Sequence, residues 1–255
     1  MRGIFTVFLI LGLLVNSALA SDLEREARLK NQIIDAILDG EPQMLEADGH
    51  EFLSIYTEAD EAVGAVLILH GRGYHPDWAD AINPLRVGLT EHGWNTLSIQ
   101  LPVLEKAAKY YDYVPIFNEA TPRIDAAIDF LREQGNQKIV IIAHSCGAHM
   151  AMQYVRNRGE DNFDAYIGIG MGATDYKQPM REPFPLDQMK KPILDIYGGD
   201  DYPAVQRLAA IRAQQMGGEG NALNQQIVVP GANHYFTDKG AELVEVVAEW
   251  LEKLK

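Results

Sequence analysis

The stretch Lys138–Gly147 reads KIVIIAHSCG, and it sets the fold class that we expect for the chain. Its first half is a short, continuously apolar run, typical of a parallel strand that is covered on both faces. Its second half, AHSCG, leads directly into a segment with helical spacing that ends near Arg156. A serine placed between a buried strand and a helix, with a small residue two positions before it and a glycine two positions after it, indicates a nucleophile elbow. The sequence therefore predicts a sharp turn that exposes the Ser145 hydroxyl above a sheet.

Two details of this motif affect how well it matches. Ala143 stands where the motif usually has glycine, and a methyl group can fit there but weakens the match. Ser145 would also lie at the N-terminus of a helix, where backbone amides and the helix dipole favour negative charge. The position therefore suits a reaction in which negative charge develops close to the serine.

Working outward from the motif, strand-like segments alternate with helical segments of ten or more residues. Such alternation implies crossover connections and a parallel sheet. Nearer the N-terminus, Asp48-Gly49 is a good turn pair for an antiparallel hairpin. We therefore expect an α/β fold, of the α/β-hydrolase type, with a mostly parallel central sheet, an N-terminal antiparallel hairpin and helices on both faces. The expected strands are 43–47, 51–58, 65–69, 94–100, 138–143, 165–171, 192–197 and 225–229, and the expected helices are 22–38, 78–92, 122–134, 146–156, 204–216 and 239–254.

A serine hydroxyl is a weak nucleophile unless a base takes its proton and an acid orients that base. In this fold the acid and then the histidine follow the serine along the chain, at the carboxyl ends of later strands. His234 lies just past the last expected strand. Asp201 follows Gly198 by three residues, the usual spacing for the acid, and we prefer it to its neighbour Asp200. The predicted catalytic residues are thus Ser145, His234 and Asp201.

Acyl transfer places negative charge on an oxygen, and fixed backbone N–H groups can stabilise it by about 3–4 kcal/mol. One expected donor is the amide of Cys146, which follows the nucleophile. The other is the amide of Arg72, in the loop that follows the strand at 65–69. Glycines on both sides of Arg72 let this backbone bend inward. Residues expected to support this loop or to contact substrate are His70, Gly71, Gly73, Asp77 and Trp78.

Several other side chains near the predicted site have alternative interpretations. Cys146 is the only cysteine, so no internal disulfide is expected, and its thiol is an alternative nucleophile to Ser145. A metal cluster is a second alternative, but no HExxH pair or zinc ligand set is present, and we expect no metal and no cofactor. The nearby histidines are instead expected to be structural, with their hydrogen bonds satisfied; they are His70, His75, His144 and His149.

Aromatic residues crowd a segment bounded by Pro102 and Pro115, which we expect to be a loop. These side chains have two interpretations that the sequence does not separate. They either wall an apolar substrate groove or pack the loop onto the sheet. The residues are Tyr110, Tyr111, Tyr113 and Phe117.

The N-terminal twenty residues have the features of a secretory signal peptide. Arg2 precedes an apolar stretch at 4–15, and Ala18-Leu19-Ala20 is a small-x-small cleavage site. An uncleaved membrane anchor is the alternative, but about twelve apolar residues fall short of the ~20 that a spanning helix needs. We therefore expect a signal peptide at 1–20, a single domain at 21–255 without a membrane span, and a periplasmic or secreted protein.

Composition limits the partners. Apolar residues make up 47% and charged residues 23% of the chain, as in ordinary globular proteins. The net charge of −14 would repel phosphate backbones, so we expect no nucleic-acid partner. The oligomeric state is left open.

Four further strings resemble a known family: LHGRGYHPDW at 69–78, PLR at 84–86, GWNTLS at 93–98 and LP at 101–102. They are similar to an uncharacterised proteobacterial α/β-hydrolase-like family labelled DUF3530, and HPDW at 75–78 is the most specific part. The likeness spans essentially the whole chain after the expected signal peptide. It implies an α/β-hydrolase fold and an exported protein, and it implies little about the substrate.

The expected function is that of an exported carboxylic-ester hydrolase, which would act on a small-molecule ester or acyl substrate through an acyl-enzyme. About twenty residues separate the strands at 165–171 and 192–197, so any lid would be small and modest substrates are favoured. One alternative is a catalytically silent binding or envelope protein with the same fold. Another is an acyltransferase that uses the same three residues.

Overall fold

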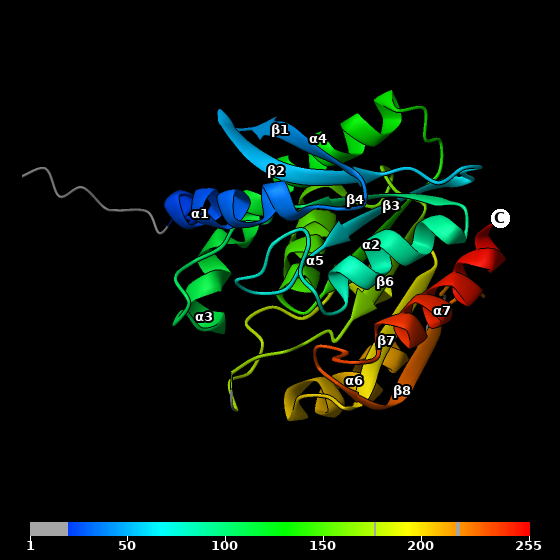
Figure 1. Cartoon of the computed structure of the whole chain (residues 1–255). Helices are drawn as coiled ribbons and strands as arrows, with labels where there is room; N and C mark the ends of the chain where they lie inside the picture. The colour runs from blue at the N-terminus through cyan, green and yellow to red at the C-terminus, as the bar shows by residue number, and fades with distance from the viewer. Residues whose placement is uncertain (1–19, 176, 218–219) are drawn as a thin grey trace, which may run out of the picture.

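The computed structural model describes residues 20–175, 177–217 and 220–255 (Figure 1). The expected signal peptide lies, apart from Ala20, outside the described residues. Within these ranges, no helix combines the length and the apolar character needed to cross a membrane.

An eight-stranded sheet forms the centre of the molecule, in the spatial order β1-β2-β4-β3-β5-β6-β7-β8. Strands β1 and β2 form the antiparallel hairpin, β2 pairs antiparallel with β4, and all later pairs are parallel. The expected fold class is thus confirmed. The strands are β1 (Glu41–Ala47), β2 (His50–Thr57), β3 (Gly64–Leu69), β4 (Trp94–Ile99), β5 (Ile139–His144), β6 (Ala165–Ile169), β7 (Ile193–Asp200) and β8 (Gln225–Asn233).

Helices cover both faces of this sheet. Figure 1 shows α2 and α7 side by side on one face, while α4, α5 and the end of α6 contribute buried residues to the core on the other face. The α-helices are α1 (Leu23–Ile33), α2 (Ile82–Glu91), α3 (Tyr110–Tyr113), α4 (Ala120–Glu133), α5 (Cys146–Arg158), α6 (Pro203–Met216) and α7 (Gly240–Leu251). Short 3-10 turns are η1 (Ile34–Ala36), η2 (Val114–Glu119), η3 (Leu186–Gln188) and η4 (Glu252–Leu254).

The two cores follow from the alternation of side chains along the strands. In β5, Val140 and Ile142 face α2 and α7, whereas Ile141 faces α4 and α5. In β3, Val66 faces the side of α2 and α7, and Leu67 faces the side of α4 and α5. Because every residue of β3 and β5 is buried, these strands read as continuous apolar runs, and their ends are fixed firmly in the middle of the molecule.

Some expected element ends are wrong, and proline explains one of them. Helix α2 begins at Ile82 instead of 78, because the ring of Pro84 conflicts with a helical carbonyl four residues earlier. Helix α4 begins at Ala120, which places Pro122 in the first turn, where its missing N–H costs nothing. The expected loop after β4 instead contains the single turn α3 followed by η2.

Candidate active site

Ser145 occupies a strained turn between β5 and α5. Its backbone has φ 55° and ψ −116°, a left-handed conformation that costs a non-glycine residue about 1–3 kcal/mol. The Ser145 amide donates a hydrogen bond of 2.8 Å to the carbonyl of Ile169, at the end of the neighbouring strand β6. This bond helps to hold the strained turn in place, so the hydroxyl projects beyond the carboxyl ends of the strands.

Gly147 is required by a close approach between α5 and the end of β3. A Cβ at this position would lie 2.6 Å from the carbonyl oxygen of His70 and 2.7 Å from that of Leu69. No larger residue fits without moving backbone atoms. The glycine therefore sets how near the turn at Ser145 comes to the loop that begins at His70.

The three side chains predicted to act together form one hydrogen-bonded chain. His234 Nε2 lies 2.7 Å from Ser145 Oγ, and His234 Nδ1 lies 2.6 Å from Asp201 Oδ1. The tautomer that fits has Nδ1–H donating to the carboxylate and Nε2 accepting from the serine hydroxyl. His234 is 2% exposed and Asp201 is 4% exposed, whereas Asp200 is exposed. Of the two aspartates, Asp201 is thus the one brought to the histidine.

Asp201 reaches His234 because the backbones of β7 and β8 almost touch. A Cβ on Gly198 would lie 2.1 Å from the carbonyl oxygen of Ala232, a distance that only glycine permits. The Asp201 amide donates to the Gly198 carbonyl over 3.1 Å, which closes a tight turn. The carboxylate also accepts from the amide of Tyr202 at 2.6 Å, so its orientation is fixed from two sides.

Gly170, at the end of β6, was missed by the sequence analysis. A Cβ on this residue would lie 2.9 Å from Cε1 of His234 and 3.4 Å from Oδ2 of Asp201. Its φ of +61° also disfavours other residues. The available signal was a glycine at the carboxyl end of a buried strand, the edge at which ligands bind in such sheets.

His144 links the serine turn to the histidine loop. Its Nε2 donates to the carbonyl oxygen of His234 over 2.9 Å. Burial lowers the pKa of His144 to about 4, so the ring is neutral near pH 7. Its Nδ1, like Nε2 of His149, has no hydrogen-bond partner in the part of the chain that the structure describes. The expectation that these histidines are fully satisfied is therefore wrong for one nitrogen of each.

His70 orients the loop that carries Arg72. Its Nδ1 donates to the Gly71 carbonyl at 2.7 Å, and its Nε2 accepts from the Leu101 amide at 2.9 Å. Burial lowers the pKa of His70 to about 3, which keeps this tautomer neutral. In a trans peptide the N–H points opposite to the C=O, so the bond to Gly71 fixes the direction of the Arg72 N–H.

The amides of Cys146 and Arg72 are free in this arrangement. Neither donates a hydrogen bond to any other described residue, and both residues line the cleft around Ser145. Two backbone donors beside an activated hydroxyl are what a developing oxyanion requires.

The remaining residues predicted near this loop hold it in place through hydrogen bonds, ring stacking and close packing. Asp77 accepts from Arg86 Nη2 at 2.6 Å and from Asn83 Nδ2 at 2.7 Å, and the Arg86 side chain is buried. Trp78 stacks on Tyr74, with ring centroids 3.9 Å apart. Gly73 has φ +72°, and a Cβ on Gly71 would lie 3.0 Å from His144 Nδ1.

An open cleft of about 610 Å³ surrounds Ser145, a size that suits a small-molecule site. The ring of Tyr202 stacks on His234 with centroids 4.2 Å apart, and the hydroxyls of Tyr202 and Tyr235 hydrogen-bond to each other. No sequence pattern predicts that these two tyrosines lie beside His234. The cleft is lined by Arg72, Tyr74, Lys106, Lys109, Tyr110, Ser145, Cys146, Ala173, Thr174, Asp175, Tyr202, Pro203, Ala204, His234 and Tyr235.

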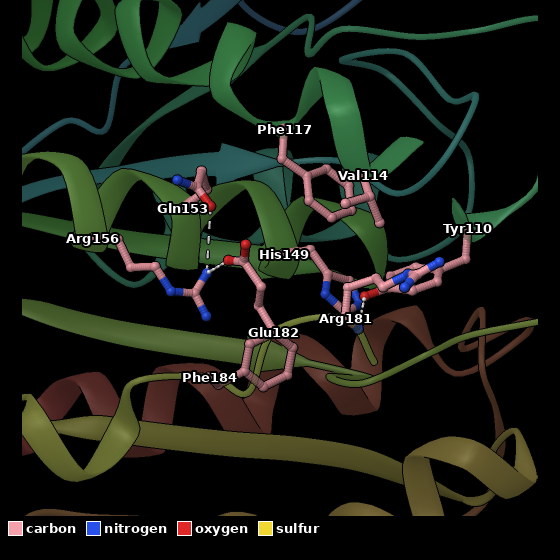
Figure 2. Close-up of a pocket in the computed structure, with 9 residues that line it drawn as sticks. All are labelled: Tyr110, Val114, Phe117, His149, Gln153, Arg156, Arg181, Glu182 and Phe184. Atoms are coloured by element: carbon pink, nitrogen blue, oxygen red, sulfur yellow. Dashed lines mark hydrogen bonds and ion pairs between the residues drawn. The ribbon is translucent and has the colours of Figure 1, made fainter. Parts of the chain in front are cut away.

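The aromatic segment after β4 combines the two roles left open by the sequence. Tyr110 both lines the cleft and is buried in the core, where Tyr113 and Phe117 also lie, and Tyr111 is partly buried against this core. Figure 2 shows a second, much smaller cavity beside Tyr110, around the ring of His149. Its volume of about 20 Å³ is that of roughly one water molecule. Near it, Arg156 forms an ion pair with Glu182 at 2.9 Å. We assign this cavity to packing.

No group of three or more metal-binding side chains (His, Cys, Asp or Glu) is placed to hold an ion among the described residues. The groups that the site offers are a hydroxyl, a base with its orienting acid, and free backbone donors.

The family profile with the description "Protein of unknown function (DUF3530)" matches residues 18–122 and 115–252. Among proteins with curated functions, none matches the sequence.

Solved structures of α/β hydrolases are similar in fold. An α-β serine hydrolase homologue from Coxiella burnetii has a TM-score of 0.65 at 17% identity, and the match covers 84% of this chain and 98% of that one. Est1E from Butyrivibrio proteoclasticus has a TM-score of 0.64 at 16% identity, with the same coverages. A dienelactone hydrolase from Anabaena variabilis has a TM-score of 0.63 at 19% identity, again covering 84% and 98%.

The buried thiol of Cys146 leads to a first prediction. Burial raises its pKa to about 12. At pH 8 about one thiol in ten thousand is then ionised, against about one in four for an unperturbed thiol of pKa near 8.5. We expect iodoacetamide to alkylate the folded protein about three orders of magnitude more slowly than the urea-unfolded protein, as measured by mass spectrometry. Rapid alkylation of the folded protein at pH 8 would favour the thiol as the nucleophile.

A second prediction concerns Gly170. In Gly170→Ala, the added methyl group should push His234 away from Asp201. We expect the far-downfield proton resonance of a short Nδ1–H hydrogen bond to disappear from the NMR spectrum. Gly135→Ala is the matched control, because Gly135 also has a positive φ but open space around its Cβ. The left-handed backbone destabilises both variants by ~1–2 kcal/mol. Loss of the resonance in Gly170→Ala alone therefore identifies the contact with His234. If the resonance persists in Gly170→Ala, the predicted close contact between residue 170 and His234 is wrong.

Proposed function

Because the chain belongs to the DUF3530 family and has the fold of the α/β hydrolases, we propose that it is a serine hydrolase that cleaves carboxylic esters of small molecules. One observation carries the proposal: the unbroken hydrogen-bonded chain from Ser145 through His234 to Asp201, at 2.7 Å and 2.6 Å. Its serine end opens into a cleft that suits a small molecule. Such a chain is the arrangement that turns a serine hydroxyl into a nucleophile.

In the proposed reaction, Ser145 Oγ attacks the ester carbonyl carbon while His234 Nε2 accepts the hydroxyl proton. The Asp201 carboxylate stabilises the imidazolium that forms. The carbonyl oxygen becomes an oxyanion, which accepts hydrogen bonds from the amides of Cys146 and Arg72. Collapse of this intermediate breaks the ester C–O bond, and His234 returns the proton to the leaving alcohol.

The second half of the reaction repeats these steps with water. His234 Nε2 takes a proton from a water molecule, whose oxygen attacks the acyl carbon. A second oxyanion collapses, the bond to Ser145 Oγ breaks, and the serine regains its proton. The strained turn at Ser145 supports this role, because strain of this kind is found where a nucleophile is held in a fixed position.

A fluorophosphonate probe provides the test. We expect it to label the folded protein at Ser145 and to leave Ser145→Ala unlabelled, as read by peptide mass spectrometry. Asp201→Asn removes the charge that stabilises the imidazolium, so labelling and ester turnover should fall by about 10⁴. Asp200→Asn is the matched control and should react at the wild-type rate, because Asp200 is exposed and its carboxylate makes no hydrogen bond to His234, which bonds Asp201.

Each alternative has its own outcome. Absence of label on the folded wild-type protein would identify a catalytically silent member of the fold. Loss of activity in Asp200→Asn with full activity in Asp201→Asn would reverse the choice of acid. Transfer of the acyl group from p-nitrophenyl esters to an added alcohol, in preference to water, would indicate an acyltransferase.

We further propose that the protein is exported to the periplasm or secreted, on the strength of the signal-peptide features at 1–20. In a Gram-negative host, we expect the protein in the periplasmic fraction to begin at Ser21, as read by intact-mass and N-terminal peptide analysis. Leu13→Arg, which interrupts the apolar stretch, should retain the protein in the cytoplasm. A wild-type protein that keeps Met1 and stays in the cytoplasm contradicts export.

A further inference from the structure

The charge of the cleft is opposite to that of the whole protein. The chain has 36 acidic and 22 basic residues, for a net charge of −14. Among the described residues, the lining of the cleft in contrast includes three basic residues, Arg72, Lys106 and Lys109, and one carboxylate, that of Asp175. A basic cleft on an acidic protein attracts anions locally.

The carboxylate of Asp175 already has partners. It accepts hydrogen bonds from Nη1 and Nη2 of Arg72, at 2.7 Å and 3.1 Å, and from the amide of Tyr110 at 2.5 Å. This bidentate pair neutralises Arg72 and fixes its side chain. The positive charge that remains in the lining of the cleft therefore comes from the two lysines.

Lys106 and Lys109 make no ion pair within the described part of the chain. Two carboxylates lie close to them in the sequence, Glu105 and Asp112. The Asp112 carboxylate accepts from the Lys109 backbone amide at 2.7 Å, and neither acid lines the cleft. Both lysine side chains are exposed, so their ammonium groups are available to a ligand in the cleft.

Two aromatic side chains of the cleft follow strands on the opposite side of β5 from these lysines. Lys106 and Lys109 follow β4, which lies on the β3 side of β5. Tyr202 and Tyr235 follow β7 and β8, on the other side of β5, and Tyr202 covers the ring of His234. Ser145, at the end of β5, therefore lies between two sides of the cleft. One side carries the lysines together with Tyr74 and Tyr110, and the other has Tyr202 and Tyr235 but no lysine or arginine among the described residues that line it.

We infer that the substrate is an ester that carries an anionic group, such as a carboxylate, phosphate or sulfate, which the ammonium groups of Lys106 and Lys109 bind. The rest of the molecule extends past Ser145 toward Tyr202 and Tyr235. This assignment rests on the proposed hydrolase function and adds the substrate class to it. Exposed charge pairs each contribute a factor of about 1.5 to 5, so two lysines should give roughly a tenfold preference for the anion.

Matched esters test this preference. Mono-p-nitrophenyl adipate and p-nitrophenyl hexanoate carry acyl chains of the same length, with and without a carboxylate. 4-Acetoxybenzoate and its methyl ester place the charge on the leaving group instead. We expect kcat/KM to be about tenfold higher for the charged member of at least one pair at low salt. The ratio should fall toward one in about 0.5 M NaCl, where the Debye length is only a few ångströms.

Two double variants identify the source of the preference. In Lys106→Gln with Lys109→Gln, the ratio of charged to neutral ester should fall to about one. Lys191→Gln with Lys253→Gln removes the same total charge near the amino ends of β7 and β8, far from the cleft, and should keep the wild-type ratio. A wild-type ratio of one or less in both pairs overturns the inference, as does a ratio that survives loss of Lys106 and Lys109.

The outcomes also separate this inference from the proposed function. Labelling of Ser145 and turnover of neutral esters without an anion preference would leave the hydrolase standing and remove the substrate class. If no ester is cleaved and no probe labels Ser145, the proposed function fails. Calorimetric binding of monomethyl adipate and methyl hexanoate to Ser145→Ala then still tests the preference, which is overturned if the two bind equally.

Discussion

The close approach of α5 to the end of β3, at Gly147, is the constraint on which the site depends. It fixes the separation between the turn at Ser145 and the loop that carries the Arg72 amide. Two further glycines act in the same way, Gly198 between β7 and β8 and Gly170 beneath His234. Backbone and ring contacts of this kind are rigid, since interiors are close-packed and nothing flexible lies between them. The hydrogen-bonded chain from Ser145 to Asp201 is thus positioned by the sheet itself.

Buried neutral histidines then orient the loops that the glycines bring together. His144 donates to the carbonyl of His234 in a neighbouring loop, whereas His70 donates to the Gly71 carbonyl of its own loop and accepts from the Leu101 amide after β4. Burial keeps the pKa of both far below 7, at about 3 and about 4. Neither ring therefore gains a proton between pH 5 and 8, and the loops they hold keep the same hydrogen bonds over that range.

The sequence was sufficient to predict the fold class and the proximity of Ser145, His234 and Asp201. Parallel strands end at one edge, so residues that follow three strands in the required order are brought together by topology alone. The role of Gly170 and the stacking of Tyr202 on His234 could not be predicted. Both depend on contacts between loops distant in the chain, and neither has a periodic pattern. The start of α2 was missed because the apolar spacing continued past the limit set by Pro84.

The ion pair between Arg72 and Asp175 has an evolutionary consequence. It joins the loop after β3 to the connection after β6, two segments that are free to vary in length on most sheets of this type. Here an insertion in either loop would separate the half-buried side chain of Arg72 from the Asp175 carboxylate. It would also change the direction in which the Arg72 amide points. A substitution that removes one charge leaves the other without its partner, so we expect positions 72 and 175 to vary together in relatives of this chain.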